Sequence, residues 1–251
     1  MQFPWHITIG AAKVPLHVLF EMGGMFVGFR YFLYLRNQQT DPLSSSNRTW
    51  VLIGAIFGAV FGSRLIGGLE NPSALADSPN IFLHFYSNKT ILGGLLGGLA
   101  GVELVKKAIG EKRSSGDLFT YPLILAMIIG RVGCFSMGVY EETYGKVTSS
   151  GLGMDLGDGQ LRHPVTLYEI TFLLLLWPVL HRLDRRYTLA EGARFKLLLI
   201  AYLIFRLMLD FIKPHYTFFF GLSTVQITCI AGLLYYIRFI LAPKKLLSTH
   251  A

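Results

Sequence analysis

The stretch from Trp50 to Leu69 reads WVLIGAIFGAVFGSRLIGGL, and it decides the fold. Its length and its single charge, at Arg64, match the roughly 20 apolar residues that an α-helix needs to cross the hydrocarbon core of a bilayer. Lipid offers the backbone no hydrogen-bond partners, so such a segment must form a helix, and barrel strands are about half as long and alternate in polarity. The sequence therefore predicts a transmembrane helix here.

The rest of the chain has the same character. Of its 251 residues, 52% are hydrophobic and 15% charged, against roughly 25% charged in soluble domains, and the mean hydropathy is +0.48. The start of the chain lacks the features of a cleavable signal, so we expect the first span to be retained. We expect an all-α, polytopic membrane protein with about seven transmembrane helices, at 14–35, 50–69, 91–109, 118–138, 165–181, 195–212 and 221–241.

Charged residues set the expected orientation. The net charge is +8, and with seven spans one side of the membrane receives the basic segments 36–48, 106–113, 182–196 and 238–245. The segment 139–164, on the other side, is acidic. The positive-inside rule then places the N-terminus outside and the C-terminus in the cytoplasm. The positive charge serves orientation and contact with anionic lipids, so no nucleic-acid partner is expected.

We expect one transmembrane domain, residues 1–251, because no polar linker is long enough to separate two. Its polar segments 70–90 and 139–164 are expected on the outer face. The two cysteines, Cys134 and Cys229, have no metal-binding spacing and form no disulfide framework. Neither a metal nor a cofactor is predicted.

Glycines recur every four residues in two of the predicted helices. This spacing gives each helix a smooth stripe that lets a neighbouring helix approach closely. Gly93 and Gly94 would also lie at the outer mouth, where a phospholipid headgroup would enter, and both roles can coexist. The stripes are Gly54, Gly58 and Gly62 in one helix, and Gly93, Gly97 and Gly101, with Gly94 and Gly98, in the other.

Ionisable residues at membrane depth are the first candidates for function. Each costs about 2.5–3.5 kcal/mol on insertion scales, so one that persists faces a partner or a polar cavity. Arg64, Arg131 and Arg206 lie near the predicted outer leaflet, and Asp210 lies one helical turn from Arg206, on the same face. One interpretation is a structural Arg206–Asp210 ion pair. The other is that the surplus positive charge binds an anionic ligand, and the arginine fork suits phosphate.

Polar residues are densest between Gly130 and Glu169. Pro164 favours helix initiation, which places Arg162 and His163 at the mouth of the fifth span and Tyr168 and Glu169 in its first turns. His163 is either a surface histidine or part of a binding network. The other polar residues and glycines of this region are Arg131, Gly133, Cys134, Glu141, Glu142, Tyr144 and Gly145.

These residues resemble the bacterial prolipoprotein diacylglyceryl transferase family. The resemblance covers most of the chain in the right order. It rests on Gly130-Arg131-Val132-Gly133 through Gly145, Arg162-His163-Pro164, Leu167-Tyr168-Glu169, Phe205-Arg206, Asp210-Phe211 and Pro214, with Gly62-Ser63-Arg64-Leu65, Gly93 to Gly97 and Gln226 in support.

The resemblance implies a reaction in the bacterial cytoplasmic (inner) membrane. The family moves the diacylglyceryl group of phosphatidylglycerol to the cysteine thiol that follows a prolipoprotein signal peptide, making a thioether and releasing glycerol phosphate. It implies catalytic roles for Arg131, Arg206, Glu141 and His163, with Asp210 orienting Arg206. The substrate-binding residues implied are Arg64, Gly93, Gly94, Gly133, Cys134, Gly145, Arg162, Tyr168, Glu169, Asp210 and Gln226.

Two residues depart from the family pattern. Leu92 stands where the family has a histidine proposed to activate the thiol, and Cys134 stands where it has an asparagine. Leucine can neither take a proton nor donate a hydrogen bond, so His163 or His84 would supply that role, or the acceptor differs. Cys134 is either an inert buried residue or a thiol whose pKa Arg131 lowers.

Three functions therefore remain open on the sequence. The first is diacylglyceryl transfer to a prolipoprotein cysteine. The second is a divergent transferase with another acceptor or headgroup, which the two departures favour. The third is a non-catalytic lipid-binding or transport protein on the same scaffold, against which the retained arginines weigh.

Overall fold

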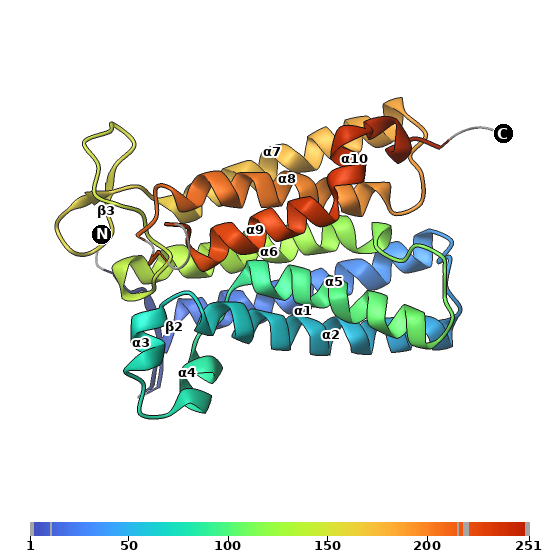
Figure 1. Cartoon of the computed structure of the whole chain (residues 1–251). Helices are drawn as coiled ribbons and strands as arrows, with labels where there is room; N and C mark the ends of the chain where they lie inside the picture. Colours follow the sequence, from blue (N-terminus) through green and yellow to red (C-terminus); the bar gives the residue numbers. More distant parts are fainter. Residues whose placement is uncertain (1–2, 11, 215, 218–220, 249–251) are drawn as a thin grey trace.

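A computed structural model describes residues 3–10, 12–214, 216–217 and 221–248. Helices dominate, and each of the seven predicted stretches contains one (Figure 1). The long helices are α1 (Leu16–Gln38), α2 (Ser45–Gly68), α5 (Ile91–Ala108), α6 (Thr120–Met137), α7 (Val165–Arg186), α8 (Ala193–Asp210) and α9 (Thr224–Tyr235). The short ones are α3 (Pro72–Ala76), α4 (Ile81–Ser87) and α10 (Ile237–Leu241), with 3-10 turns η1 (Asp117–Phe119), η2 (Gly138–Tyr140) and η3 (Pro243–Leu246).

Within the part of the chain that the structure describes, four helical segments are long and apolar enough to cross a membrane: Leu16–Gln38, Ser45–Gly68, Asp117–Tyr140 and Val165–Arg186. Helices α5 and α8 have 18 residues each, of which three and four are charged, and α9 has 12 residues. The predicted continuous helix 221–241 is wrong in one respect, because it is interrupted at Tyr236 between α9 and α10. The helical membrane class itself is confirmed.

Two small β-hairpins accompany the helices. Strands β1 (His6–Ile9) and β2 (Ala12–Pro15) pair antiparallel just before α1, and β3 (Met154–Asp155) pairs with β4 (Leu161–Arg162). Both hairpins lie at one end of the bundle with α3 and α4, and we call this the hairpin end (Figure 1). The opposite end carries the α1–α2, α5–α6 and α7–α8 connections and the C-terminal helix α10.

The two glycine stripes allow close helix approach, as predicted, and they do so where α2 and α5 meet. A methyl group added to Gly54, Gly58 or Gly62 would overlap the backbone of Gly101, Gly97 or Gly93, respectively, so only glycine allows this approach. Helix α1 packs in the same way along α6, where Gly24 and Gly28 face Ala126. Close backbone packing therefore joins both helix pairs.

The bundle buries one apolar core and presents a second apolar surface outward. Tyr121, Ile124, Leu173, Leu198 and Tyr202 join α6, α7 and α8 in the core. Large apolar side chains elsewhere are highly exposed, as expected of helices surrounded by lipid. Among them are Met22, Phe26, Phe57, Phe61, Leu104, Leu175, Met208 and Leu234, each more than 60% exposed.

Candidate active site

Three neighbouring helices bring two arginines to one carboxylate. Arg131 comes from α6, Glu169 from the first turns of α7 and Arg206 from α8. Nε of Arg131 lies 2.8 Å from Oε1 of Glu169, and Nη1 of Arg206 lies 3.4 Å from Oε2. The hydroxyl of Tyr202 also donates to Oε1, at 2.8 Å. We call these four residues the arginine network, and all of them are buried.

The arginine network carries one more positive than negative charge. Nε of Arg206 is buried and has no hydrogen-bond partner among the residues that the structure describes. Nη1 of Arg131 contacts only a weak acceptor, Sγ of Cys134, at 3.6 Å. Because buried donors are nearly always bonded in native proteins, spare guanidinium donors indicate a place where an anion binds.

Arg206 contacts a carboxylate of another helix rather than Asp210, the partner that the four-residue spacing suggested. No such pair occurs among the ion pairs of the described chain, and Arg206 reaches Glu169 on α7 instead. Asp210 accepts a 2.5 Å hydrogen bond from the hydroxyl of Ser223, which caps α9 together with Gln226. The physical reason is packing: the carboxylate of a neighbouring helix lies closer to the guanidinium than the one a turn further along α8.

A polar cavity of about 380 Å³ opens at the hairpin end. Its wall includes Asp210, so the cavity begins one turn beyond Arg206 in α8. Burial raises the pKa of the Glu70 carboxyl, and burial together with the charge of Arg206 lowers the pKa of Lys213. The lining residues are Glu70, Glu142, Tyr144, Lys146, Asp210, Lys213, Pro214, Tyr216, Ser223, Thr224 and Val225.

Arg162 belongs to a second polar cluster, in the segment 139–164. Nη2 of Arg162 pairs with Asp158 at 2.7 Å, and its guanidinium lies 5.0 Å from the centre of the Tyr144 ring. The hydrogen bond from Arg162 lowers the pKa of the Asp158 carboxyl below its usual range. None of the hydrogen bonds or ion pairs within the described segments joins this cluster to the arginine network.

His163 and Gly145 lie beside this cluster. Nδ1 of His163 is 3.1 Å from the hydroxyl of Tyr168, and the amide of Gly145 donates to the His163 carbonyl at 3.0 Å. A side chain at Gly145 would collide with His163, which explains the glycine. His163, Gly145 and Tyr168 therefore form one contact at the mouth of α7.

The other predicted residues lie in several places. Arg64, at the end of α2, stacks on the ring of Tyr86 in α4 at 5.0 Å. Gly93 packs against Gly62, whereas a methyl group added to Gly94 would lie at an ordinary contact distance, 3.7 Å, from Cβ of Ser63. Gly133 packs against Phe20 and His17 of α1.

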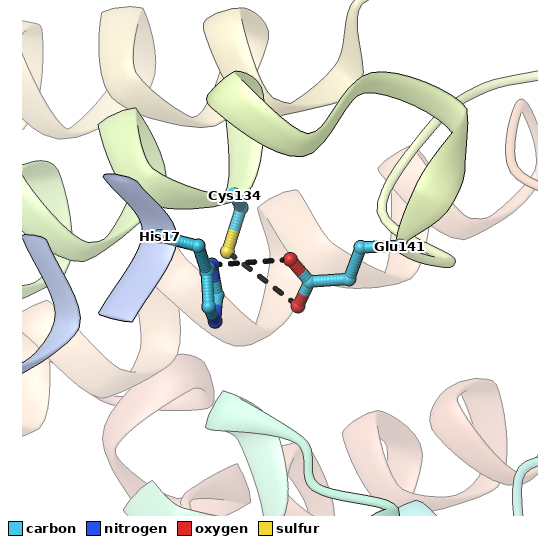
Figure 2. A group of neighbouring side chains, drawn as sticks. All are labelled: His17, Cys134 and Glu141. Carbon is cyan, nitrogen blue, oxygen red and sulfur yellow. Dashed lines mark hydrogen bonds and ion pairs between the residues drawn. The ribbon is translucent and has the colours of Figure 1, made fainter. Parts of the chain in front are cut away.

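His17 and Glu21 are the residues that our reading of the sequence missed. His17, in the first turn of α1, lies beside Cys134 and Glu141, and its ring faces both of them (Figure 2). A signal existed: His17 and Glu21 are four residues apart in an apolar span, so they share a helix face. Recording every ionisable residue of the first span would have found them.

The two histidines proposed to replace the family's thiol-activating residue are both engaged elsewhere. Nε2 of His84 lies 2.9 Å from the Gly68 carbonyl, and His163 contacts Tyr168. Leu92 itself is fully buried among Leu199, Leu203 and Cys229. Of the three histidines discussed here, His17 is the one that lies next to Cys134 and, through it, to Arg131.

Comparison with known proteins gives a family. A family model described as prolipoprotein diacylglyceryl transferase matches residues 4–242. A phosphatidylglycerol–prolipoprotein diacylglyceryl transferase of Campylobacter hominis is 31% identical over 76% of this chain and 73% of its own. Proteins of the same name from Wolbachia pipientis and Rickettsia felis are 30% and 27% identical, over 92% and 84% of this chain and 91% and 83% of their own. The match spans nearly all of the bundle and its arginine network, and the chain belongs to the prolipoprotein diacylglyceryl transferase family.

Proposed function

We propose that this chain transfers the diacylglyceryl group of phosphatidylglycerol to the cysteine thiol that follows a prolipoprotein signal peptide. The relatives carry this activity in their names. The observation that carries the proposal is the arginine network. In it, Arg131 and Arg206 share Glu169 and retain guanidinium N–H donors that have no strong protein acceptor. One phosphodiester would neutralise the surplus charge.

Charge change at the phosphate explains why two arginines are needed. A thiolate attacks the glyceryl carbon, a sulfur–carbon bond forms, and the carbon–oxygen bond to phosphate breaks. The electron pair leaves with glycerol phosphate, so the phosphate charge rises from −1 towards −2 in the transition state. Guanidinium donors held in place by Glu169 stabilise that developing charge without reorganising.

The surrounding residues receive supporting roles. The cavity beside Asp210 has the size of a small-ligand pocket and would admit the glycerol headgroup, with Ser223 in its wall and Gln226 holding Ser223 by a hydrogen bond. Glu141 lies beside Cys134, which in turn contacts Arg131, and we place Glu141 at the acceptor thiol. We assign Arg162, His163, Tyr168 and Gly145 to the entrance for the signal peptide.

A second group of residues would guide the lipid. Arg64, on the ring of Tyr86, lies where α2 ends, and Gly94 lies in the first turn of α5, beside Ser63 of α2. We assign both to the phospholipid path. Gly93 and Gly133 contribute by letting their helices approach closely.

We further infer one membrane domain with seven crossings in the bacterial inner membrane, the N-terminus outside and the C-terminus in the cytoplasm. The basic segments between the spans support this orientation through the positive-inside rule. The hairpin end would then face outward, where prolipoproteins are modified. A cysteine introduced at Ser150 would be labelled from outside intact cells by an impermeant maleimide, and one at Ser114 would not.

Transfer itself is tested with purified protein in phosphatidylglycerol vesicles and a lipobox peptide. We expect the thioether peptide and glycerol phosphate, detected by mass spectrometry. Arg206→Ala should abolish the product, a loss of at least about 10²–10³-fold. Arg186→Ala, which removes an arginine at the far end of α7, should leave the rate unchanged.

The other outcomes are informative. A product formed only with a non-peptide acceptor would replace this proposal by a divergent transferase, which Leu92 and Cys134 would explain. Lipid binding without any product would indicate a non-catalytic lipid-binding protein.

A further inference from the structure

A nitrogen, a sulfur and a carboxylate converge at the hairpin end from three separate segments. They belong to His17 at the start of α1, Cys134 near the end of α6 and Glu141 just after η2. One ligand atom from each lies within 4.8 Å of the other two, and Figure 2 shows the imidazole, the thiol and the carboxylate turned towards one another. More than 100 residues separate His17 from Cys134, so no spacing rule could have found the cluster.

A second carboxylate, that of Glu21, contacts the imidazole of His17 through its other ring nitrogen. Nε2 of His17 lies 3.4 Å from Glu21, and Glu21 is itself held by Lys89 at 2.5 Å. Metal-binding histidines commonly donate one ring N–H to a carboxylate in this way, which fixes the tautomer and leaves the other nitrogen as a ligand. In His17 the other nitrogen is Nδ1, which faces Glu141 and Cys134.

The facing atoms of His17 and Glu141 are at ion-pair distance without hydrogen-bond geometry. Nδ1 of His17 and Oε2 of Glu141 are 3.2 Å apart, both are buried, and neither has a hydrogen-bond partner within the described parts of the chain. Sγ of Cys134 is 4.0 Å from Oε1 of Glu141. Two buried polar atoms without hydrogen-bond partners call for an explanation, and one cation bound between the imidazole, the sulfur and the carboxylate would supply it.

We propose that His17, Cys134 and Glu141 bind one divalent metal ion of the Zn²⁺ class. Imidazole, thiolate and carboxylate are the three protein ligand types of Zn²⁺, which prefers four tetrahedral ligands at about 2.0–2.3 Å. Thiolate and carboxylate together carry two negative charges, which the ion neutralises. Nη1 of Arg131 lies 3.6 Å from Sγ, and the charge of Arg131 is paired with Glu169.

Three protein ligands leave a fourth coordination position open, as in catalytic zinc sites. If the proposed function holds, on which this step alone rests, the open position takes the acceptor cysteine. Coordination releases the thiol proton to solvent and leaves a thiolate beside Arg131, where the phosphate is bound. The thiolate then forms the sulfur–carbon bond as the carbon–oxygen bond breaks. The ion would thus activate the acceptor thiol, the role proposed for the family's histidine, whose place Leu92 takes in this chain.

Cobalt binding tests the ion site without any substrate. Wild-type protein in detergent, stripped with a chelator and titrated with Co²⁺, should bind one ion per chain and develop a sulfur-to-cobalt charge-transfer band. Zn²⁺ should abolish the band by displacement. Wild-type protein that binds no stoichiometric ion, or binds it without the band, would overturn the proposal.

Matched variants locate the ligands. Cys134→Asn introduces the residue that the family pattern has here and should lose the band, while Cys229→Ser, which changes the other buried cysteine, should keep it. Glu21→Gln should weaken Co²⁺ binding about 10–100-fold. A band that persists in Cys134→Asn would also refute the assignment.

Peptide addition separates this proposal from the proposed function. A lipobox peptide should intensify the band of the Co²⁺ protein, because a second thiolate joins the ion, and the same peptide with serine should not. Arg206→Ala should keep both the ion and this response while losing transfer. If the band does not respond to the peptide, thiol activation by the ion is refuted, whether or not transfer occurs.

Discussion

Each end of the bundle places two arginines on one carboxylate. At the opposite end, Arg48 is fully buried, and its Nε and Nη2 both bond to Asp41, while Nη1 donates to the Ser115 carbonyl at 3.1 Å. Arg36, which is 28% exposed, completes the group with a 3.0 Å bond to Asp41. Each nitrogen of the Arg48 guanidinium therefore has a protein acceptor.

The arginine network at the hairpin end has the same residue types, but its guanidinium donors have fewer protein acceptors. Glu169 receives one contact from each guanidinium, at 2.8 Å from Arg131 and 3.4 Å from Arg206, and Nε of Arg206 has no hydrogen-bond partner among the described residues. Arg48 is buried at least as deeply as Arg131 and Arg206. The difference teaches that unused donors, rather than buried charge as such, distinguish a binding site from a structural pair.

Of the variants that test this comparison, Arg131→Gln should lower the transfer rate most. We expect transfer to fall at least about 10²–10³-fold, or about 3–4 kcal/mol of transition-state stabilisation, because one of two phosphate-binding groups is lost. Glu169 keeps Arg206 and Tyr202 as partners and the introduced glutamine can still donate to it, so the free energy of unfolding in detergent should fall by less than the about 3 kcal/mol expected of Arg48→Met. A variant with normal kcat would break the comparison.

Arg48→Met should show the reverse behaviour. Removing one partner of a buried ion pair costs about 3–5 kcal/mol, and since Asp41 retains Arg36 we expect about 3 kcal/mol of lost stability. Detergent unfolding curves measure that loss. The transfer rate per folded molecule should stay that of the wild type, and a fall of tenfold or more would mean that the two ends are coupled.

Local features of the sequence were enough to predict the helices and to identify Arg131 and Arg206 as candidate site residues. The helices follow from apolar length, and close helix approach at both glycine stripes follows from glycines repeating every four residues, although the sequence did not say that the two stripes meet each other. Arg131 and Arg206 were found because charge is costly in an apolar span. Such features depend only on neighbours in the sequence.

Partners across helices were not predictable. The four-residue spacing pointed from Arg206 to Asp210, but the packing of α7 against α8 brought Glu169 closer. The cluster of His17, Cys134 and Glu141 likewise depends on how α1 lies along α6. Helix faces can be read from a sequence, whereas which faces meet is decided by the whole bundle.

A third arginine–carboxylate pair, Arg162 with Asp158, sharpens the comparison because it lies at the surface. Asp158→Asn should cost only about 0.2–1 kcal/mol near neutral pH, as exposed pairs do. The hydrogen bond from Arg162 lowers the pKa of Asp158 in the folded protein, so its stabilisation is complete above the ordinary carboxyl pKa of about 3.9 and is lost as the pH falls through the lower folded value. Unfolding curves of wild type and variant should therefore differ slightly at pH 7 and converge on acidification. A loss above about 2 kcal/mol would mean that this exposed pair behaves like Arg48 and Asp41, and that burial does not separate the structural pairs of this protein.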